Sequence, residues 1–556
     1  MLRRRDLLRY GLASGASFLG ARRAHARSSA PDDPPPSPRT APFIQKLPFP
    51  PELTPVEPFR ADCPLPAQSD LSRLRFYRLI QEEHLVSLHP ELPLTRAWGY
   101  RDANVARGTP RNIAGPTFIA HSGEPIIVRH ENQLPEDHVG FGEPTTTVHF
   151  HGGHVPSISD GFPQDIPGFK VAIEPGHTFD YCYPLLDPGF STNEADATDR
   201  PATMWYHDHI LDFTGPNVYM GLAGFFLYFD ELDSGSERSG LRLPSGEFDV
   251  SLLLRDKRLD RKGQLLYDGL TDHSGFLGDK WLVNGAIQPF FEVKRRKYRF
   301  RMLNGCNARF LGMQLVTERG QPQPFTLIAT EGGLMATPVP ERELAFLSPA
   351  QREDIVIDFS RYREGTVLYL EDRVDQPDGR GPKGDFDRPE LLGSGRRFLK
   401  IIVGSAAEDP SQVPDVLRPF EAISVAEIAR ATRREFVFER RHGVWVINGE
   451  SVDLERSVAN SRLNQPEVWR LVNKGGGWWH PIHIHLEFMH VLKRNGRRAV
   501  DDLERDGQSK RDVITLGPND DVEVFFKFRD FPGPWVFHCH TLEHEDAFMM
   551  ARFSVV

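Results

Sequence analysis

Cysteine is scarce in this chain, which has four cysteines among 556 residues. So small a number excludes a fold that is held together by a framework of disulfides. One of the four, Cys539, is assigned below to a metal site. The other three, Cys63, Cys182 and Cys306, allow at most one internal disulfide, and the sequence does not indicate which pair forms it or whether all three are free thiols.

Long hydrophobic runs are also missing after the N-terminal segment. A membrane-spanning helix needs about 20 consecutive apolar residues, so we expect no span in the mature protein. The chain has 67 basic and 77 acidic residues, a net charge of −10 and no long basic tract. This balance argues against nucleic acid as a partner.

Residues 1–26 have the features of a targeting signal. Arg3-Arg4-Arg5-Asp6-Leu7-Leu8 precedes a weakly apolar stretch of Gly, Ala and Ser, and Ala24-His25-Ala26 suits signal cleavage. The paired arginines before Leu-Leu resemble a twin-arginine signal, a route that carries proteins already folded. We therefore expect a periplasmic or secreted protein exported by the twin-arginine route, with an ordinary secretory signal as the alternative.

Residues 27–70 form a proline-rich N-terminal arm. Proline is too frequent there for a helix or a central strand, so the arm is either extended along the surface or a loose leader. Beyond the arm, short runs of β-branched and aromatic residues alternate with Gly, Pro, Asn and Asp. This texture is typical of β-sandwiches.

An internal repeat indicates three domains. Arg-x-x-Asn closes a strand-like run at Arg129–Asn132, Arg301–Asn304 and Arg470–Asn473. A turn that leads into an alternating strand follows in each copy, from Glu174, Ser348 and Gly517. The outer copies also share Trp205-Tyr206-His207-Asp208-His209 and Trp535-Val536-Phe537-His538-Cys539-His540. Because the chain is too long for one hydrophobic core, we predict β-sandwich domains at 71–235, 236–410 and 411–556, with metal chemistry in the first and third.

Ten of the 21 histidines lie in four short groups. Each group contains His-x-His, a spacing that places both imidazoles on one face of a strand. The groups are His149-Phe150-His151, His207-Asp208-His209, His480-Pro481-Ile482-His483-Ile484-His485, and His538-Cys539-His540 followed by His544 and Met549. Imidazole is the commonest neutral metal ligand, whereas histidines scattered over a surface have no reason to be grouped in this way.

The last group predicts that one strand serves two metal sites. Strand alternation directs Cys539 to the face opposite His538 and His540. A thiolate, two imidazoles and a weak thioether are the ligands of a blue copper site. Here these ligands would be Cys539, His480, His544 and Met549. Zinc, the rival metal, usually has three or four ligands and gives no role to a cysteine between two ligand histidines.

The four groups resemble the four copper motifs of the multicopper oxidases, and the resemblance runs from Leu71 to Val556. It implies an all-β fold of three cupredoxin-like Greek-key β-sandwich domains that holds four copper ions. Type 1 copper would lie in the third domain, and the other three ions would form a cluster between the first and third domains. Stretches such as Trp205–His209 and Lys297–Arg301 look most like the branch of spore-coat laccase, bilirubin oxidase and phenoxazinone synthase.

The resemblance assigns twelve ligands position by position. Type 1 copper would be bound by His480, Cys539, His544 and Met549. Type 2 copper would be bound by His149 and His483. The two type 3 ions would be bound by His151, His207, His209, His485, His538 and His540.

The same resemblance implies a laccase-like oxidase. Phenolic or aminophenolic donors would give single electrons at type 1 copper, and the cluster would reduce dioxygen to water. Glu545 and Asp160 lie at positions similar to those of proton-relay acids in the spore-coat laccase branch, although each could instead orient a ligand. We expect a monomer that acts on a small-molecule donor and dioxygen.

Other functions fit the sequence less well. A metallo-oxidase of manganese or iron would keep all twelve ligands and is the main alternative. The nine methionines form no Met-rich segment, which argues against a cuprous-ion oxidase. A copper nitrite reductase would leave the type 3 ligands unexplained, and a non-catalytic coat protein would not need the full set. The natural donor stays open, because the loops that select it follow no general pattern.

Overall fold

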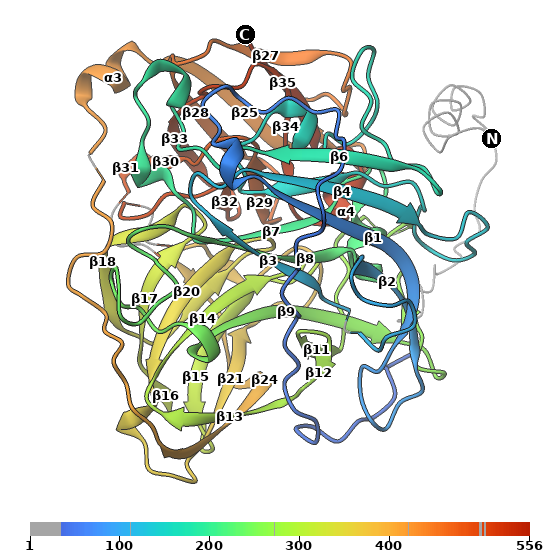
Figure 1. Cartoon of the computed structure of the whole chain (residues 1–556), viewed down its shortest axis with the longest axis vertical. Helices are drawn as coiled ribbons and strands as arrows, with labels where there is room; N and C mark the ends of the chain where they lie inside the picture. Colours follow the sequence, from blue (N-terminus) through green and yellow to red (C-terminus); the bar gives the residue numbers. More distant parts are fainter. Residues whose placement is uncertain (1–34, 112, 272, 421, 500–502, 505–506) are drawn as a thin grey trace, which may run out of the picture. The chain divides into compact units, whose positions relative to one another are not determined.

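The computed structural model describes residues 35–111, 113–271, 273–420, 422–499, 503–504 and 507–556. The predicted signal at 1–26 and the start of the arm lie outside these residues. Residues Ser37–Val556 form one compact unit, and most of its regular elements are strands (Figure 1). Within the described ranges, no helix has the length and apolar character needed to cross a membrane.

The first part of the unit is a pair of sheets. One contains, in order, β2 (Thr95–Asp102), β1 (Arg75–Val86), β4 (Ile126–Gln133) and β6 (Thr178–Tyr183). The other contains β3 (Gly115–His121), β8 (Ala223–Phe229), β7 (Thr203–Asp208) and β5 (Val148–His151). Alternate side chains of both sheets, among them Val128, Tyr181 and Phe226, are buried in one core, as the period of two along a strand requires.

The middle part has two larger sheets. One contains β12 (Ala286–Ile287), β11 (Lys280–Val283), β9 (Asp249–Leu259), β14 (Lys297–Asn304), β20 (Arg352–Asp358), β17 (Phe325–Thr330) and β18 (Gly333–Arg342), with β10 (Leu265–Leu266) beside β9. The other contains β13 (Phe290–Arg295), β24 (Leu391–Ala406), β21 (Val367–Val374), β15 (Leu311–Thr317) and β16 (Pro322–Gln323), with β19 (Ala345–Leu347) beside β15. A small hairpin joins β22 (Gly384–Asp385) and β23 (Arg388–Pro389).

The last part again has two sheets. One contains β26 (Val444–Ile447), β25 (Thr432–Arg441), β28 (Pro466–Asn473), β33 (Asp521–Lys527), β30 (His490–Arg494) and β31 (Arg497–Arg498). The other contains β27 (Ser457–Ser461), β35 (Met550–Val555), β34 (Gly533–Cys539), β29 (His480–Ile484) and β32 (Val513–Leu516). The described α-helices are short: α2 (Thr214–Met220), α3 (Val425–Arg430) and α4 (Leu542–Asp546). The 3₁₀ turns are Leu71–Arg73, Ser157–Ser159, Phe190–Thr192, Ala197–Asp199, Gly246–Phe248 and Phe359–Arg361.

The three parts share one strand topology. In each, an early strand runs parallel to the strand that ends in Arg-x-x-Asn, in the pairs β1 and β4, β9 and β14, and β25 and β28. On its other side, the strand that ends in Arg-x-x-Asn pairs with an antiparallel strand, which is β6, β20 or β33. The predicted all-β fold of three repeated sandwiches is therefore confirmed. All the strands fall inside the ranges 71–235, 236–410 and 411–556, and the limits of these ranges remain predictions.

The repeated asparagine has the same structural role in each sandwich. Asn304 donates from Nδ2 to the carbonyl oxygens of Arg309 and Leu347, and its Oδ1 accepts from the N–H of Cys306. Asn132 and Asn473 make the equivalent three hydrogen bonds. An amide can satisfy two carbonyls and one N–H at once, which explains why asparagine marks the repeat in the sequence.

The described part of the proline-rich arm is bound along the body. The N–H of Leu47 donates to the carbonyl of Phe290 in β13 at 2.7 Å, and the N–H of Leu53 donates to that of Thr117 in β3 at 2.8 Å. Further along, Cys63 forms a disulfide with Cys182 of β6, while Cys306 and Cys539 are free and buried. The structure thus selects the extended arm over the loose leader and settles which cysteines pair.

Candidate metal centres

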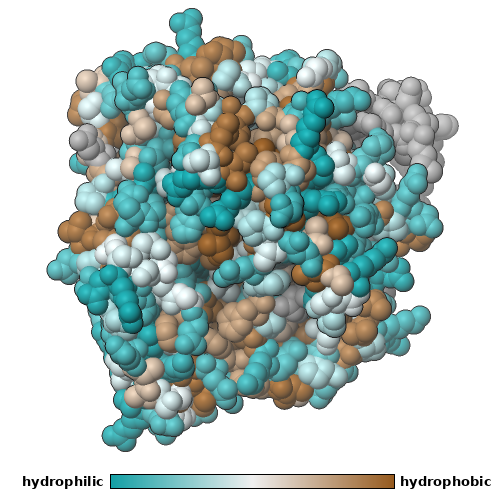
Figure 2. Space-filling model, viewed as in Figure 1, coloured by the Kyte–Doolittle hydropathy of each residue, from teal (hydrophilic) through white to brown (hydrophobic). Residues whose placement is uncertain are grey.

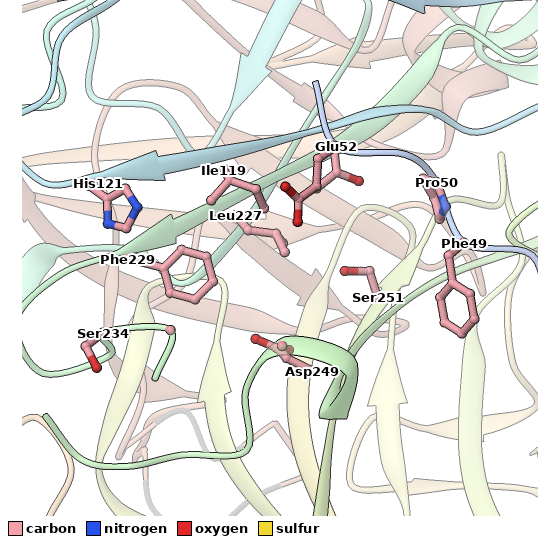
Figure 3. Close-up of a pocket in the computed structure, with 13 residues that line it drawn as sticks. Phe49, Pro50, Glu52, Ile119, His121, Leu227, Phe229, Ser234, Asp249 and Ser251 are labelled. Carbon is pink, nitrogen blue, oxygen red and sulfur yellow. The ribbon is translucent and has the colours of Figure 1, made fainter. Parts of the chain in front are cut away.

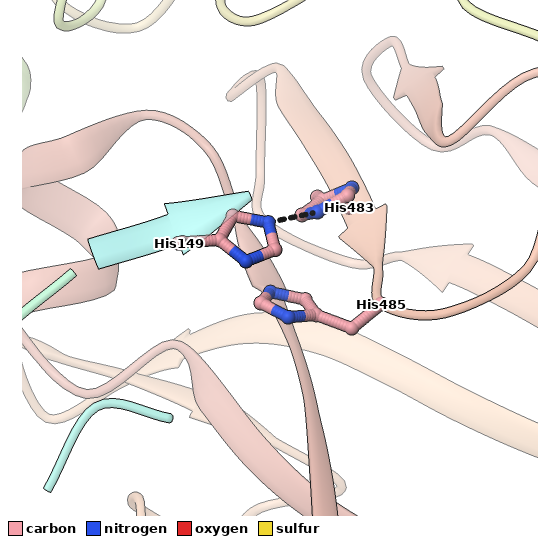
Figure 4. Close-up of side chains that lie close together, drawn as sticks. All are labelled: His149, His483 and His485. Carbon is pink, nitrogen blue, oxygen red and sulfur yellow. Dashed lines mark hydrogen bonds between the residues drawn. The ribbon is translucent and has the colours of Figure 1, made fainter. Parts of the chain in front are cut away.

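Eight histidines from the first and third sandwiches converge on one buried place. Pairing of β5 with β7 sets His149 opposite His207, and pairing of β29 with β34 sets His483 opposite His538. The second histidine of each group follows two residues later and therefore points the same way. All eight are at most 1% exposed: His149, His151, His207, His209, His483, His485, His538 and His540. Figure 4 shows His149 of the first sandwich facing His483 and His485 of the third.

The hydrogen bonds of two facing rings indicate a cation between the sandwiches. His149 donates from Nδ1 to the carbonyl of Asp160 at 2.6 Å, and His483 donates from Nδ1 to the carbonyl of Asp512 at 2.7 Å. A neutral imidazole has one proton, so Nε2 of each ring carries a lone pair. These two Nε2 atoms lie 3.2 Å apart (Figure 4). Two lone pairs at that distance repel each other unless a metal ion binds both.

The same arrangement recurs at the other rings. His485 donates from Nδ1 to Oδ2 of Asp160 at 2.6 Å, and His538 has its Nδ1 2.9 Å from Oε2 of Glu545. Their Nε2 atoms are 3.2 Å apart, and Nε2 of His209 lies 3.1 Å from Nε2 of His538. Nε2 of the buried His207 and both ring nitrogens of the buried His540 find no hydrogen-bond partner among the residues described. Free lone pairs in a dry site fit metal binding.

Burial keeps six of the eight rings neutral. It lowers the pKa of His209 and of His540 to about 3. Burial, reinforced by neighbouring imidazoles, also puts four further pKa values well below the usual range, those of His151, His207, His483 and His485. Neutral imidazole is the form that binds metals, so the cluster is ready to act as ligands at neutral pH.

A second group lies on the opposite face of β34. Sγ of Cys539 is 3.5 Å from Nδ1 of His480 and 3.5 Å from Nδ1 of His544, and the two Nδ1 atoms are 3.2 Å apart. Met549 is fully buried beside them, its backbone bonded to His544 and Cys539. Burial raises the pKa of the Cys539 thiol, so a thiolate here requires a cation as its neighbour. The two faces of one strand thus serve two groups, as strand alternation predicts.

Both carboxylates that the sequence singled out touch the eight-histidine cluster. Asp160 follows the Ser157–Ser159 turn, and besides His485 its Oδ1 lies 3.4 Å from Nδ1 of His149. Glu545 lies in α4, with Oε1 3.5 Å from Nδ1 of His209. Each is at most 1% exposed. These contacts place both groups where they can orient imidazoles of the cluster.

Residues outside the motifs also border the two groups. Asp512 contacts His483 through its carbonyl and His151 through its carboxylate. Trp445 of β26 packs on His544 with ring centroids 4.0 Å apart, and Trp478 lies 5.5 Å from the same ring. The sequence reasoning missed Asp512 and Trp445, because neither belongs to a spaced motif and each meets its histidine only through sheet packing.

A hollow of 360 Å³ lies apart from both groups. Phe49 and Glu52 of the arm, His121, Phe229 and Asp249 are among its lining residues (Figure 3). None of the twelve predicted ligands lines it. Asp249 is bonded through both carboxylate oxygens to Arg301, so this hollow offers no second metal site of the kind found at the histidines.

Comparison with known proteins agrees with the geometry. Residues 102–232 and 421–556 match two family models, each described as multicopper oxidase, and these ranges contain all twelve predicted ligands. A bilirubin oxidase of Albifimbria verrucaria is 35% identical over 451 residues, which cover 79% of this chain and 71% of that protein. A laccase of Haloferax volcanii is 32% identical over 537 residues, which cover 90% of this chain and 85% of that protein.

The fold gives the same result. A crystal structure of laccase from Pediococcus acidilactici matches with a TM-score of 0.73 and 25% identity, covering 93% of this chain and 95% of that one. The predicted cupredoxin-like character of the sandwiches is thereby confirmed.

Proposed function

Because the chain belongs to the multicopper oxidase family, as a laccase-like copper-dependent oxidoreductase that uses oxygen, we propose that it oxidises phenolic or aminophenolic donors one electron at a time. Four such oxidations reduce one dioxygen to water. The observation that carries this proposal is β34, whose Cys539 faces one group of ligands while His538 faces the other. A single strand therefore joins a site suited to one-electron transfer to a buried polynuclear site.

We infer four copper ions and assign their ligands from the sequence motifs, with support from the free lone pairs. The type 1 ligands are His480, Cys539, His544 and Met549. The type 2 ligands are His149 and His483. The type 3 ligands are His151, His207, His209, His485, His538 and His540. When bound, copper supplies single-electron transfer and the reduction of dioxygen, chemistry that side chains alone do not provide.

The chain itself supplies geometry and a dry environment. Rings such as His149 and His483 are fixed by hydrogen bonds from the nitrogen that does not face the cluster, and such second partners hold ligand rings in one orientation. Burial of all eight rings excludes bulk water. Cys539 is covalently continuous with His538 and His540, so the backbone provides a short route for electrons between the two groups.

We assign proton supply to Asp160 and Glu545. Reduction of dioxygen to water consumes protons at a place that bulk water does not reach. Both carboxylates touch imidazoles of the cluster, so each could hold and release a proton beside the rings that would bind copper. Orientation of the rings by the same contacts is compatible with this role.

Aromatic donors suit the surroundings of His544 better than metal ions do. Trp445 and Trp478 pack against this ring, and Trp478 is largely buried, with 9% of its surface exposed. Cζ of Arg440 lies 5.4 Å from the Trp478 ring centroid and Cζ of Arg380 lies 5.6 Å from it. Aromatic rings attract a flat phenol, whereas two guanidinium groups repel a manganese or iron cation. The metallo-oxidase alternative is therefore not favoured.

We further propose export by the twin-arginine route and action as a monomer. The Cys63–Cys182 disulfide fits an oxidising compartment, in agreement with the signal predicted at 1–26. On the face shown in Figure 2, hydrophobic residues form several patches separated by hydrophilic ones. Light scattering on the purified protein tests the monomer, and replacing Arg3-Arg4-Arg5 by lysines tests the export route, since transport by that route depends on the arginine pair.

Oxygen uptake with different donors tests the proposed reaction. The copper-loaded protein should consume oxygen with 2,6-dimethoxyphenol without releasing peroxide, and uptake should saturate with donor. Mn²⁺ and Fe²⁺ are offered separately at the same concentrations. Saturable oxidation of a metal ion, with no oxidation of phenols, would replace the proposal by the metallo-oxidase.

A further inference from the structure

An arginine of the middle sandwich, Arg352, reaches a carboxylate that lies beside the histidine cluster. Arg352 of β20 is fully buried and donates from Nη1 to Oδ1 of Asp512 at 2.8 Å and from Nη2 to Oδ2 at 2.7 Å. Its Nε donates to the carbonyl of Thr203 in β7 at 2.9 Å. Arg352 thus holds the carboxylate of Asp512 in the third sandwich, and it is itself bonded to the first sandwich. A bidentate pair of this kind fixes the position of the carboxylate as well as neutralising its charge.

The carboxylate fixed in this way meets one ring of the cluster. Oδ1 of Asp512 lies 3.3 Å from Nε2 of His151, while Nδ1 of His151 is buried with no hydrogen-bond partner in the described part of the chain. The rings of His149, His207 and His483 have the opposite arrangement, because each uses Nδ1 for its hydrogen bond. His151 is therefore reversed relative to these neighbours, with Nε2 as donor and Nδ1 as the free nitrogen.

We propose that Asp512 is a positioning residue of the cluster: its carboxylate, fixed by Arg352, accepts the Nε2 proton of His151 and so leaves Nδ1 of that ring free to bind metal. This inference rests on the proposed copper cluster. Asp512 also accepts the Nδ1 proton of His483 through its backbone carbonyl, and the rings of His151 and His483 stack with centroids 3.8 Å apart. One residue thus selects the tautomers of two stacked ligands that belong to different sandwiches.

The backbone after His151 packs closely against the pair of Arg352 and Asp512. A Cβ at Gly152 would lie 2.9 Å from Nη2 of Arg352 and 3.0 Å from Oδ2 of Asp512, so the glycine after His151 permits this close approach. Both oxygens of Asp512 are already bonded to the guanidinium. The carboxylate is thus better placed to hold a ring than to bind a metal ion itself.

Asp512→Asn tests the proposal. The amide keeps the shape but loses the charge and one acceptor, so it no longer enforces the tautomer of His151. We expect 10–100-fold weaker binding of copper at the cluster, the usual effect of losing such a partner, measured by titration with a competing chelator and by electron paramagnetic resonance. The blue band of type 1 copper should keep its position and intensity. Arg352→Lys keeps the charge but not the bidentate geometry. It should weaken the binding of the same copper ions by a smaller factor.

Asp256→Asn is the matched control. Asp256 accepts from Nε of the buried Arg309 at 2.7 Å, and this pair contacts none of the twelve predicted ligands. The control should lose thermal stability without selective loss of cluster copper. Cluster copper bound by Asp512→Asn as tightly as by the unaltered protein would overturn the proposal. So would equal loss of type 1 and cluster copper in Asp512→Asn. Absence of all copper from the unaltered protein would instead contradict the proposed function.

Discussion

At the scale of single residues, the nitrogen that does not bind metal decides how each imidazole can act. His149, His207 and His483 bond to backbone carbonyls through Nδ1, and His485 bonds to a carboxylate. The sequence predicts which rings are ligands, because His-x-His spacing fixes their faces. It does not predict the oxygens that orient them, since Asp160 and Asp512 reach the rings from loops whose paths depend on the whole sandwich.

Glu545 provides a residue-scale test of proton supply. Glu545→Gln keeps the size of the side chain but removes its ability to release a proton, so oxygen reduction should slow by about 100-fold. Reduction of type 1 copper by a phenol should keep its rate. Stopped-flow spectroscopy of the blue band separates the two steps. Unchanged oxygen turnover in the variant would show that Glu545 serves only to orient His538 and His209.

Asp530 gives a residue-scale prediction about pH. Burial alone would raise the pKa of this carboxyl group, but the hydrogen bond from His154 and the charge of that ring outweigh burial and lower the pKa from 3.8 to about 2. Asp530 also accepts from the N–H groups of Gly189 and Ser191. Because the folded-state pKa lies below the unfolded one, this group stabilises the fold above pH 4, and the contribution is lost as pH falls to about 2.

Asp530→Asn should therefore lower the free energy of unfolding by roughly 1–3 kcal/mol at pH 7. The difference between the variant and the unaltered protein should shrink as pH falls from about 4 to about 2. Chemical denaturation across this range measures both quantities. A difference that stays constant with pH would mean that the carboxylate charge has no part in the effect.

At the scale of elements, β34 and its neighbours show what a strand pattern can predict. The alternation of side chains along β34 predicts that Cys539 and His538 face different sites, and the structure has them on opposite faces of the strand. The pairing of β5 with β7 and of β29 with β34 then decides which rings meet, and a single sequence does not contain this register. Trp445 illustrates the limit, because β26 comes to lie against His544 of α4 only after the sheets have packed.

The repeated asparagine yields a test at this scale. Asn304→Ala leaves two buried carbonyls and one buried N–H without a partner at the end of β14, so the free energy of unfolding should fall by about 3 kcal/mol or more. Asn460→Ala, at an exposed position of β27, is the control and should change it by less than about 0.5 kcal/mol. Denaturant titrations of the two variants measure these free energies of unfolding. Equal decreases in the two variants would contradict the structural role of Asn304.

At the scale of the whole molecule, the three copies of the sandwich have different roles. The outer copies hold all twelve predicted ligands, while the middle copy supports them: Arg352 holds Asp512, and Asn307 with Tyr267 holds Glu543 of α4 beside His544. The internal repeat predicts the number of sandwiches. It does not reveal how the outer two meet, since that contact joins surfaces more than 300 residues apart, as between His149 and His483.

The arm adds a whole-molecule prediction. The disulfide between Cys63 and Cys182 closes a segment of 119 residues, so replacing both cysteines by serine should lower the free energy of unfolding by roughly 2–5 kcal/mol. A reducing agent should destabilise the unaltered protein by a similar amount and leave the double variant unchanged. Thermal unfolding with and without reductant gives both values. Insensitivity of the unaltered protein to reductant would contradict the prediction.

Copper content together with the absorption spectrum tests the central claim most directly. The purified protein is loaded with copper under air, and the metal is counted per chain while the visible and near-ultraviolet bands are recorded. The account predicts four copper ions, a strong blue band from the Cys539 thiolate and a near-ultraviolet band from the cluster. One copper ion or none, or a blue band without the cluster band, would contradict it.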